Sequence, residues 1–560
     1  MQAYINQKGE IKSKRYNIPL LLAEMQSYIN QKGEIMKDTF YITTPIYYPS
    51  NKLTLGNCYT TVVCDSLARF NRMCGKDVFY LTGTDEHGQK IEKKALACGK
   101  PEMEYLNEII DDTKALWKML DISYDKFIRT TDDYHVKTVQ KIFSRLYEKG
   151  QIYKSSYKGL YCTPCESFWT EEQLVDGKCP DCGRPVEPME EEAYFFRLSD
   201  YQNKILDLYK TNPNFLRPQS RVNEMVNNFI KPGLKDLCVS RTSVKWGVPV
   251  EFDPKHTIYV WIDALPNYLS ALGYLQEDDK NFNKFWPADV HVVGKEIVRF
   301  HAIIWPAILM ALDLPLPKQI YGHGWLLFGN DKLSKSKETG KKEVIDPRVL
   351  VARYGLDSVR LFLTKEIQFG QDGPYSQDLF LNAFNTNLAN EYGNLVSRTC
   401  GMIGKYLNGT LNKAGELTEI DNAFVSEIRT KRTKVFEQME DINPSGALNT
   451  IFEMFSRTNK YIDETAPWVL FKENNTARIN TVMNLISEAI IIANTLLLPF
   501  LTDKPKMVYA NWGLKIPTSF NEYDDFGFIA DGTPVVKGEN LYQRLDINKE
   551  IADLNDIANK

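Results

Sequence analysis

The stretch Thr39-Phe-Tyr-Ile-Thr-Thr44 continues through Pro45-Ile-Tyr-Tyr48 to Leu53-Thr-Leu-Gly-Asn57, and its pattern decides the fold. Residues 39–44 are typical of a buried strand, and apolar positions recur at helical spacing after residue 57. Gly56 stands where this helix begins, so a ligand can approach the backbone closely. Because the free N–H groups and the macrodipole of a helix N-terminus attract phosphate, the stretch predicts a phosphate-binding turn. The apolar face of the helix consists of Tyr59, Val62, Val63, Leu67 and Phe70.

A second stretch, Leu326-Leu-Phe-Gly-Asn-Asp-Lys-Leu-Ser-Lys-Ser-Lys-Glu-Thr-Gly340, places Lys332 and Lys335 in a Ser-rich loop after an apolar strand. Lysine carries a compact charge on a flexible stem, so two of them can follow a moving triphosphate. Nucleotide transfer depends mainly on positioning and charge neutralisation by the protein. Taken alone, a Lys/Ser cluster is also typical of a solvated surface loop. Its pairing with the upstream strand-helix turn favours a nucleotide site.

Apolar strand candidates alternate with helical stretches over the first part of the chain. The candidate strands are residues 40–44, 78–82, 291–293 and 320–328. Such alternation predicts a parallel α/β sheet, in which ligands bind at the carboxyl ends of the strands. The interval between residues 82 and 291 is far longer than an ordinary crossover, so we expect an inserted module there.

Beyond about residue 384 the strand signal disappears and helical periodicity takes over. Apolar positions spaced by three and four occur in residues 385–406, 420–439, 446–464 and 476–498. This pattern predicts a helical bundle. Past residue 505 the sequence becomes irregular, and residues 540–560 are interpreted as a short polar tail.

The N-terminal residues contain a direct repeat. Residues 1–11 recur as residues 25–35, with Ala3 replaced by Ser27. Two copies are too few to build a core by stacking, so we expect residues 1–35 to be a disordered extension and the fold to begin near Met36. The expected division is 36–149 and 241–330 for the two halves of the nucleotide-binding fold, 150–240 for the insertion, 331–384 for the Lys-Ser loop and the segment after it, 385–539 for the helical part and 540–560 for the tail.

Four cysteines are grouped as Cys162-Thr-Pro-Cys165 and Cys179-Pro-Asp-Cys182. Two Cys-x-x-Cys pairs at this separation are typical of a tetrahedral zinc knuckle. Four thiolates leave no open position for water, so the site is expected to be structural. Redox pairing, independent nucleic-acid binding and four unrelated thiols are the alternatives. The 10 cysteines of the chain fit a reducing compartment with one metal site better than a disulfide framework.

Composition sets wide bounds on function. The chain is 43% hydrophobic and 25% charged, which is ordinary for a globular protein of two to four domains. No apolar run approaches the roughly 20 residues that cross a bilayer, and the N-terminus does not resemble a secretory signal, so we expect a cytoplasmic protein. The net charge of -4 gives no global attraction for nucleic acid, so any RNA contact must come from local patches.

At its two signature stretches the chain resembles a class I aminoacyl-tRNA synthetase. That class carries His-Ile-Gly-His at a strand-helix junction and Lys-Met-Ser-Lys-Ser after its nucleotide fold, where this chain has Thr54-Leu-Gly-Asn57 and Lys332-Leu-Ser-Lys-Ser336. Other segments are similar to the methionyl-tRNA synthetase family and follow its order from about residue 36 to residue 500. These segments are Thr43-Thr-Pro-Ile-Tyr-Tyr48, Leu81-Thr-Gly-Thr-Asp-Glu-His-Gly-Gln-Lys90, Tyr259-Val-Trp-Ile-Asp-Ala264, Gly294-Lys-Glu-Ile-Val-Arg-Phe-His301 and Ala466-Pro-Trp468.

The resemblance implies an enzyme that converts methionine and Mg-ATP to methionyl-adenylate and then transfers the methionyl group to tRNA. It also implies a Rossmann-type catalytic domain with a zinc-containing insertion, followed by an α-helical anticodon-binding domain. By resemblance Asp85 takes the α-ammonium group of methionine, although a lone Asp in a turn is also an ordinary turn residue. The positions that wall the methionine side chain are Ile46, Tyr48, Trp261, Leu265, Tyr268, Phe300 and His301, with Trp305 beside the region where homocysteine is rejected. Taken singly, the aromatic residues and His301 are also typical of a core.

The nucleotide signature departs from the family pattern. The resemblance implies ATP contacts from Thr54, Gly56, Asn57, Gly294, Glu296, Lys332 and Lys335, of which Thr54, Asn57 and the two lysines are the catalytic candidates. No histidine stands in the signature, where the family usually has two. Thr54 and Asn57 can still donate hydrogen bonds to phosphate oxygens, but neither carries an imidazolium charge, so rate and pH dependence are expected to differ.

Four further residues match the family positions that read the CAU anticodon. They are Asn390, Asn394, Arg398 and Trp468. The first three share one helical face through their spacing of four. Unstacked loop bases are recognised by amide and guanidinium hydrogen bonds and by stacking on aromatic planes. Without the resemblance, Trp468 also fits a core tryptophan and Arg398 a surface cation.

Two other functions stay open at the level of sequence. The missing histidines are compatible with a catalytically weak paralogue that binds tRNA or regulates without charging it. A sister synthetase for leucine, isoleucine or valine is disfavoured, because the chain has no room for a large editing domain. The expected partners are tRNA(Met), methionine and ATP, with no membrane. A monomer is expected, because no C-terminal dimerisation domain is recognised.

Overall fold

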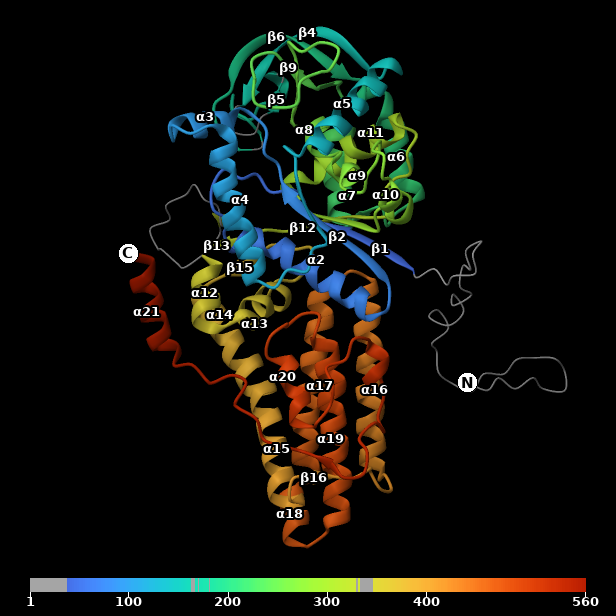
Figure 1. Cartoon of the computed structure of the whole chain (residues 1–560), viewed down its shortest axis with the longest axis vertical. Helices are drawn as coiled ribbons and strands as arrows, with labels where there is room; N and C mark the ends of the chain where they lie inside the picture. Colours follow the sequence, from blue (N-terminus) through green and yellow to red (C-terminus); the bar gives the residue numbers. More distant parts are fainter. Residues whose placement is uncertain are drawn as a thin grey trace, which may run out of the picture.

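The computed structural model describes residues 38–162, 167–169, 171–180, 182–328, 331–332 and 346–559. The repeat within residues 1–35 lies outside these ranges. Figure 1 shows an elongated molecule in which a sheet-containing part lies above a bundle of long helices. The C-terminal helix lies beside the boundary between the two parts.

A parallel sheet forms the centre of the upper part. Within the described residues it has six strands in the order β3-β2-β1-β11-β12-β7, and every neighbouring pair is parallel. Their bounds are β1 Thr39–Thr43, β2 Asp77–Thr84, β3 Lys126–Arg129, β7 Leu216–Arg217, β11 Val290–Gly294 and β12 Ile320–His323. The order reverses between β1 and β11, where ligands bind in doubly wound folds. The predicted Rossmann-type sheet is confirmed.

Both faces of the sheet are buried, as expected for parallel strands covered by helices. Tyr41 and Phe79 point into the core beneath one set of helices, whereas Ile42 and Tyr80 point into the other core. The second of these cores continues without a break into the lower helices, for example to Ile491. The helices of this part are α2 Leu55–Met73, α3 Gln89–Ala97, α4 Glu102–Met119, α5 Asp133–Glu148, α6 Gln202–Thr211, α7 Gln219–Met225, α8 Val260–Ala264, α9 Asn267–Ser270, α10 Lys280–Phe285 and α11 Trp305–Ala311, with the π-segments η3 Val226–Ile230 and η5 Phe300–Ile304.

The predicted strand over residues 320–328 is wrong, because the chain breaks into two strands there. β12 ends at His323, and β13 (Leu326–Phe328) belongs to a separate sheet with β14 (Asp331–Lys332) and β15 (Gly373–Tyr375). Gly324 lies at the break, where a Cβ atom would clash with the backbone of Gln371. The close approach of these two backbones is the physical reason for the break.

The expected insertion contains its own antiparallel sheet at the top of Figure 1, in the order β5-β4-β6-β8. Its long hairpin pairs β4 (Ile152–Cys162) with β6 (Glu187–Phe196), so that Ile152 faces Phe196 across the ladder. β5 (Ser167–Trp169) and β8 (Leu237–Cys238) complete it. β9 (Ser240–Arg241) and β10 (Thr257–Ile258) form a small ribbon that returns the chain to α8.

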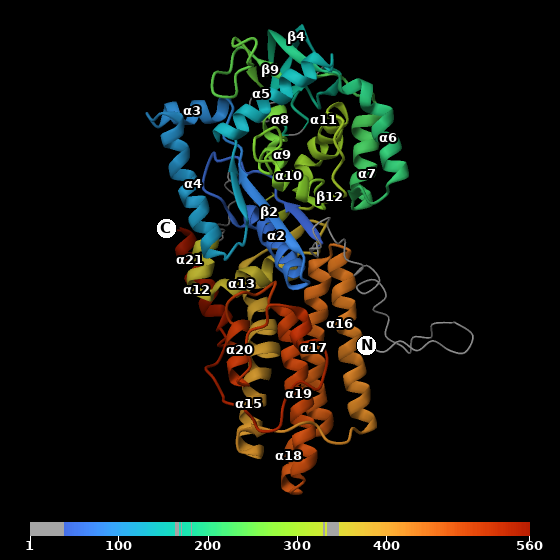
Figure 2. The ribbon, with the colours of Figure 1, turned by 45° about the vertical axis from the view of Figure 1, so that its right-hand side comes forward.

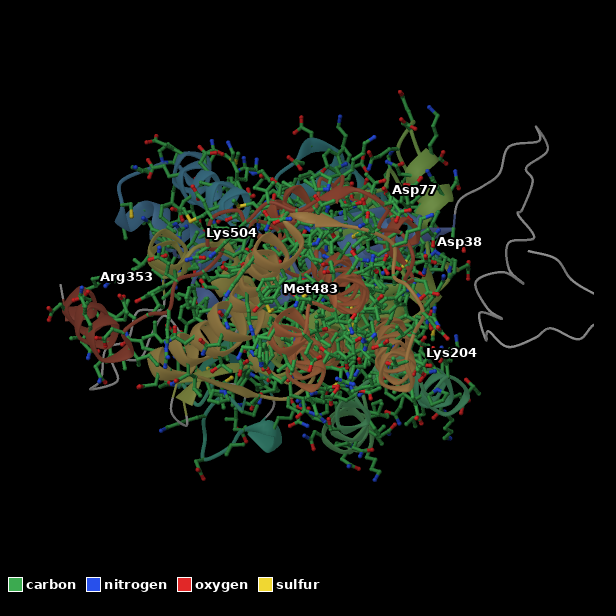
Figure 3. All side chains as sticks on the ribbon, turned by 90° about the horizontal axis from the view of Figure 1, so that it is seen from below. Asp38, Asp77, Lys204, Arg353, Met483 and Lys504 are labelled. Carbon is green, nitrogen blue, oxygen red and sulfur yellow. The ribbon has the colours of Figure 1, made fainter. Side chains whose placement is uncertain are left out.

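Long antiparallel helices form the lower part, as predicted. They are η7 Phe384–Gly393, α15 Asn394–Leu407, α16 Glu419–Glu440, α17 Pro444–Thr465, α18 Pro467–Lys472, α19 Thr476–Leu497 and α20 Pro505–Asn511, preceded by α12 Pro347–Tyr354, α13 Leu356–Leu361, η6 Phe362–Glu366 and α14 Gln377–Ala383. Their starts carry side-chain caps, such as Asn443 accepting from Gly446 N–H and Asn475 accepting from Arg478 N–H. In Figure 3 Met483 of α19 lies at the centre, with charged side chains pointing outward around it.

The helix α19 qualifies the expectation that no segment could cross a membrane. By length and composition alone it is apolar enough to do so, but 94% of its most apolar window is buried within the protein. Such burial is that of a core helix.

The polar tail expected over residues 540–560 requires a correction. The described part of this segment contains the helix α21 (Ile547–Asn559), and its Leu554 is fully buried. Arg353 of α12 forms ion pairs with Glu550 and Asp553 of α21. A short stretch of an amphipathic helix with many charges has a polar composition, because its apolar positions are spread over several turns. The sequence of this segment alone therefore indicates a polar tail.

Candidate functional site

The candidate site begins where β1 and β2 end. After β1 the chain continues beside β2, with Tyr47 N–H donating to Gly83 O at 2.8 Å and Asp85 N–H donating to Tyr47 O at 3.0 Å. These bonds place Ile46 and Asp85 on adjacent segments at the carboxyl edge of the sheet. This edge is where a doubly wound fold presents its ligand-binding side chains.

The helix α2 starts at the same edge, and its first turn uses Asn57 in a capping box. The Oδ1 atom of Asn57 accepts from the Thr54 backbone N–H at 3.0 Å and from the Thr54 hydroxyl at 3.3 Å. Asn57 therefore has a structural function that the sequence did not reveal. Among the described residues no partner is recorded for its Nδ2 donor, which stays available to a ligand. Gly56 lies between them in the same turn.

A cluster of apolar and aromatic side chains comes together behind this edge, and we call it the aromatic cluster. It consists of Trp261, Leu265, Tyr268, Phe300 and His301. The Trp261 and Phe300 rings are stacked with 3.4 Å between centroids and 12° between planes. Ile46 packs against the same core. The residues come from α8, α9, η5 and the turn between α8 and α9, so the fold unites segments that are distant in sequence.

His301 is buried and neutral. Its Nδ1 lies 2.9 Å from Ile297 O, and its Nε2 lies 2.7 Å from the Tyr268 hydroxyl. A carbonyl oxygen only accepts, so Nδ1 carries the proton and Nε2 accepts from Tyr268. Burial lowers the pKa of His301 to about 4. His301 therefore orients the Tyr268 hydroxyl and carries no charge at neutral pH.

Trp305 is also anchored by a histidine. Its Nε1–H donates to His291 Nε2 at 3.3 Å, and the other nitrogen of His291 lies 2.8 Å from the Thr43 hydroxyl. Burial holds the pKa of His291 well below its ordinary value, so the ring is neutral. The Tyr268 ring stacks on His291 at 4.2 Å between centroids. Trp305 is thus a rigid wall behind the aromatic cluster.

Tyr48 does not join the aromatic cluster. Its ring packs with Trp246 and Tyr105 against a separate small core around Ile91, and Lys90 Nζ lies 5.4 Å from its centroid. Ile46 and Tyr48 are two positions apart and would share one face of a strand. Because β1 ends at Thr43, that rule does not apply to them, and sequence spacing does not predict this placement.

Three residues that sequence reasoning left without a role link the site together. His87 Nδ1 lies 2.6 Å from Asp263 Oδ2, and His135 Nε2 lies 3.2 Å from Asp263 Oδ1. Burial alone would lower the pKa of His87, but the Asp263 carboxylate raises it above its ordinary value. Burial alone would raise the pKa of Asp263, but the two histidines lower it to about 2. His87 and Asp263 stand two residues after Asp85 and Trp261, which was the available signal.

The end of β11 presents Gly294 and, in the turn after it, Glu296. The Oε2 atom of Glu296 accepts from Trp325 Nε1–H at 2.6 Å. Lys295 lies over the Trp325 ring at 3.9 Å and forms an ion pair with Asp372 at 2.6 Å. The turn is therefore fixed to the segments on either side of the Lys-Ser loop.

Beside that turn, His323 ends β12 and meets α2. Its Nε2 lies 2.7 Å from the Thr60 hydroxyl, and its Nδ1 lies 2.7 Å from Gly324 O. His323 was not predicted as a site residue, and its place at a strand end was the signal for it. The contact joins the first turns of α2 to the end of β12.

The Lys-Ser loop is described only in part. The backbone of Lys332 pairs with Leu327 in the antiparallel β13–β14 ladder. Lys335 lies outside the described residues. The described start of the loop, at Lys332, therefore belongs to the small sheet that follows β12.

Three of the four predicted metal ligands lie together. The Sγ atoms of Cys162, Cys179 and Cys182 all lie within 4.8 Å of one another, and those of Cys162 and Cys182 are 3.6 Å apart. Tetrahedral zinc with bonds of about 2.3 Å requires sulfur atoms roughly 3.8 Å apart, whereas a disulfide requires about 2.05 Å. The spacing fits metal coordination. Cys165 lies outside the described residues.

Two of the four predicted anticodon residues, Arg398 and Trp468, lie together in the helical part. The guanidinium of Arg398 lies 5.6 Å from the Trp468 ring and 3.1 Å from Asp463. Trp468 is 37% exposed, so it is not a core tryptophan. Asn394 opens α15 and is exposed, as is Asn390 in the π-segment before it.

Comparison with known proteins gives matches over most of the chain. The profile of the family described as tRNA synthetases class I (M) matches residues 40–188 and 182–400, and that of the anticodon binding domain of methionyl tRNA ligase matches residues 411–551. A methionine–tRNA ligase of Caldanaerobacter subterraneus subsp. tengcongensis is 55% identical over 93% of this chain and 81% of its own length. That of Clostridium acetobutylicum is 52% identical over 93% and 80%. The structure of Mycobacterium tuberculosis methionyl-tRNA synthetase in complex with methionyl-adenylate has a TM-score of 0.86 and 37% identity, covering 90% of this chain and 100% of that one.

Proposed function

The chain belongs to the methionyl-tRNA synthetase family of class I aminoacyl-tRNA synthetases, and on that premise we propose which of its side chains carry the reaction. Its activity is that of a methionine–tRNA ligase, which forms methionyl-adenylate from methionine and ATP and passes the methionyl group to tRNA. The observation that carries the site is the meeting of Asp85, the α2 N-terminus and the aromatic cluster at one edge of the sheet. Relatives at 51–55% identity are ligases, which disfavours an inactive paralogue.

Asp85 binds the α-ammonium group of methionine, and the aromatic cluster together with Ile46 receives the side chain. A thioether is polarizable and favours contact with ring edges, which suits Trp261, Phe300 and Tyr268. The Tyr268 hydroxyl, whose proton is donated to neutral His301, adds one fixed polar oxygen to the wall of the pocket. Tyr48 contributes from the neighbouring core, and its ring marks the outer side of the site.

The nucleotide lies along the α2 N-terminus, with Mg²⁺ on its phosphates. The helix N–H groups at Gly56 and the Asn57 amide donate to phosphate oxygens. The Thr54 hydroxyl joins them when the nucleotide binds, by giving up its hydrogen bond to Asn57 Oδ1. Gly294 lies beside the adenosine and leaves room for the Glu296 carboxylate, which a Cβ atom there would meet at 2.5 Å. Glu296 accepts from ribose hydroxyls. Lys332 and Lys335 neutralise the charge that develops as pyrophosphate leaves, which is the main task in such transfers.

The insertion binds one structural zinc ion. The spacing of Cys162, Cys179 and Cys182 supports this assignment, and Cys165 supplies the fourth thiolate. Four thiolates close the coordination sphere, so the ion holds the tip of the insertion together and takes no part in catalysis. We take residues 150–240 as the inserted segment, whose strand β7 (Leu216–Arg217) returns to pair with β12 in the central sheet.

At the other end of the molecule, Asn390, Asn394, Arg398 and Trp468 read the anticodon. The exposure of Trp468 and the position of Arg398 over its ring support a platform on which a base stacks. We assign the helical part over residues 385–539 to this task. The cytoplasmic location and the monomeric state stay predictions, which fractionation and light scattering test.

The substitution Asp85→Asn tests the methionine site. Loss of a charge-assisted hydrogen bond costs about 1.5 to 3 kcal/mol, so KM for methionine should rise roughly 10- to 100-fold while KM for ATP changes little. Asp77→Asn, at the opposite end of β2 and paired with Lys284, is the matched control and should have no effect. Equal rises in both KM values would remove Asp85 from the methionine site.

A further inference from the structure

The short helix α13 (Leu356–Leu361) connects the two parts of the molecule. Figures 1 and 2 place it between α2 and α20. It carries two buried charges, Asp357 and Arg360, with exposures of 2% and 0%. A charge is left in such a position only when its partners compensate for lost hydration, so each partner is informative.

Arg360 binds the end of the core helix α19. Its Nε–H donates to Phe500 O at 2.7 Å and its Nη2–H donates to Pro499 O at 3.2 Å. Carbonyl groups after a helix have no intrahelical donor and carry partial negative charge, so a guanidinium is well suited to them. Its Nη1–H donates to Leu120 O, in the turn after α4, at 3.0 Å.

Asp357 binds the other side of the same turn. Its carboxylate accepts from Asp503 N–H at 3.0 Å and from Lys504 N–H at 2.8 Å, directly before α20. The Tyr542 hydroxyl donates to it at 2.7 Å. Helix α13 therefore holds the carbonyl side of the α19–α20 turn with a cation and the N–H side with an anion.

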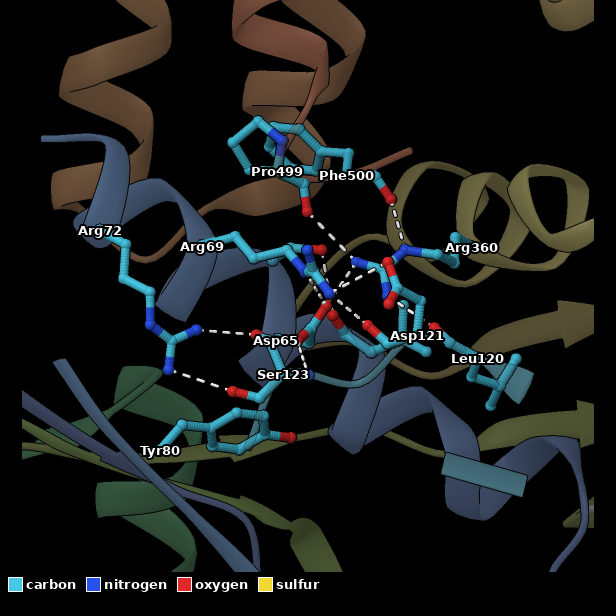
Figure 4. A network of polar contacts seen from close by, with 12 residues as sticks. Asp65, Arg69, Arg72, Tyr80, Leu120, Asp121, Ser123, Arg360, Pro499 and Phe500 are labelled. Atoms are coloured by element: carbon cyan, nitrogen blue, oxygen red, sulfur yellow. Dashed lines mark hydrogen bonds and ion pairs between the residues drawn. The ribbon is translucent and has the colours of Figure 1, made fainter. Parts of the chain in front are cut away.

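The charge of Arg360 is balanced by Asp65 on α2, as Figure 4 shows. Arg360 Nη2 lies 2.7 Å from Asp65 Oδ2, and neither side chain is exposed. Asp65 also accepts from Arg69 Nε–H at 2.7 Å and from the Ser123 N–H and hydroxyl at 2.7 and 2.6 Å. Burial alone would raise the pKa of Asp65, but Arg360 and Arg69 hold it below its ordinary value.

These contacts join α2, whose N-terminus is proposed to bind ATP, to α19, which follows the helix proposed to contact the anticodon. The N-terminus of α2 carries Thr54 and Asn57, and α19 follows directly on α18, which carries Trp468. We call the buried set of Asp65, Asp357 and Arg360 the joint. Figure 4 draws the part of it that links α2 to the end of α19, which is the contact of Asp65 with Arg360 and of Arg360 with Pro499 and Phe500.

We propose that Asp65 and Arg360 are positioning residues for transfer to tRNA, because they fix the helical anticodon-binding part relative to α2. Anticodon contacts can then place the 3′ end of tRNA at the adenylate. Formation of the adenylate from small molecules does not require that alignment. The proposal rests on the ligase activity of the chain. It adds that the transfer step depends on this contact, whereas adenylate formation does not.

The test is Arg360→Lys in the full chain. Lysine keeps the positive charge, but one ammonium group cannot reach Asp65, Phe500 and Leu120 together as the planar fork does. Misplacement by about 1 Å costs roughly 10²-fold in a positioned reaction, so kcat for tRNA charging should fall about 10- to 100-fold. Methionine-dependent ATP–pyrophosphate exchange should stay within about twofold of the unmodified protein.

The matched control is Arg217→Lys, since Arg217 also bridges the sheet and the bundle through Asp441 at 2.6 Å, but at the surface. It should leave both reactions unchanged, because exposed pairs contribute little. A tRNA with an altered anticodon gives a second readout. The factor by which it slows charging should shrink in Arg360→Lys, because anticodon contacts no longer guide the acceptor end.

Equal losses of exchange and charging, or no loss of either, would overturn the proposal. If Arg360→Lys does not fold, Asp65→Asn replaces it, since asparagine keeps the shape and an acceptor for Ser123 but loses the charged oxygen that binds Arg360 and Arg69. Absence of exchange in the unmodified protein would instead contradict the ligase activity itself, so the two failures are distinguishable.

Discussion

The carboxylate of Asp263 accepts a hydrogen bond from His87 Nδ1 at 2.6 Å, and this contact joins the segment of Asp85 to the helix of Trp261. His135 binds the other oxygen of the same carboxylate. All three side chains are buried. The backbone that presents the proposed ammonium ligand and the helix that presents the aromatic cluster are thus held by one buried ion pair.

Asp263→Asn should therefore weaken methionine binding without a direct contact to methionine. Breaking a buried ion pair by removing one charge costs about 3 to 5 kcal/mol, part of which should appear as a lower free energy of unfolding. Enzyme kinetics should show a raised KM for methionine and an unchanged KM for ATP. A variant that loses stability but keeps its KM for methionine would show that the pair serves only the fold.

The same pair predicts a pH dependence of stability. The pKa of His87 is raised in the folded protein, so its contribution is complete below its ordinary value of 6.5 and is lost as pH rises through the raised value. The melting temperature of His87→Gln should differ most from that of the unmodified protein at pH 6.5 and below. The difference should shrink as pH rises through the raised pKa, above which the imidazole is neutral in both states. A constant difference over this range would contradict the ion pair.

Asn57 has two separable tasks, and two substitutions divide them. Asn57→Asp keeps an acceptor for the Thr54 N–H, so the helix cap and the melting temperature should be preserved. It removes the Nδ2 donor, so adenylate formation should slow on the order of 10² to 10³. Asn57→Ala should show the same slowing together with about 0.5 to 2 kcal/mol of lost stability. Unchanged pyrophosphate exchange in Asn57→Asp would mean that Asn57 only caps the helix.

The cysteine cluster predicts one zinc ion per chain, measured by elemental analysis of the purified protein. Cys179→Ser should lower the zinc content and loosen the insertion, because three thiolates hold the ion less tightly than four. Cys98→Ser, at an exposed cysteine after α3, is the control and should keep the zinc. Purified protein with no zinc and with all four thiols titratable would contradict the site.

Trp468→Ala should impair tRNA charging and leave adenylate formation intact. A stacked base contributes about 1 to 3 kcal/mol, so charging efficiency should fall roughly 5- to 150-fold. Phe471→Ala removes a second exposed ring from the same helix, one that packs on Tyr406 at 4.7 Å, and serves as the control. Losses of similar size in both variants would assign the effect to the packing of α18.

The sequence predicted the sheet and the bundle because their signals are periodic and local. The sequence did not predict the strand break at Gly324, which a single close approach of two backbones causes. It also missed the helix around Leu554, whose few apolar positions stand among many charged ones. It also named Asp85 and Trp261 from their motifs but not the contact between His87 and Asp263, which are 176 positions apart. Contacts of that kind follow from tertiary packing. The use of Asn57 as a cap was readable in principle, since Thr54 and Asn57 have capping-box spacing.

Methionine-dependent exchange of pyrophosphate into ATP by the purified full-length chain tests the central claim most directly. The account predicts exchange that requires methionine and Mg²⁺, falls strongly in Lys335→Ala, and is accompanied by charging of tRNA(Met). Binding of tRNA(Met) without any methionine-dependent exchange would contradict the account and establish a tRNA-binding paralogue in its place.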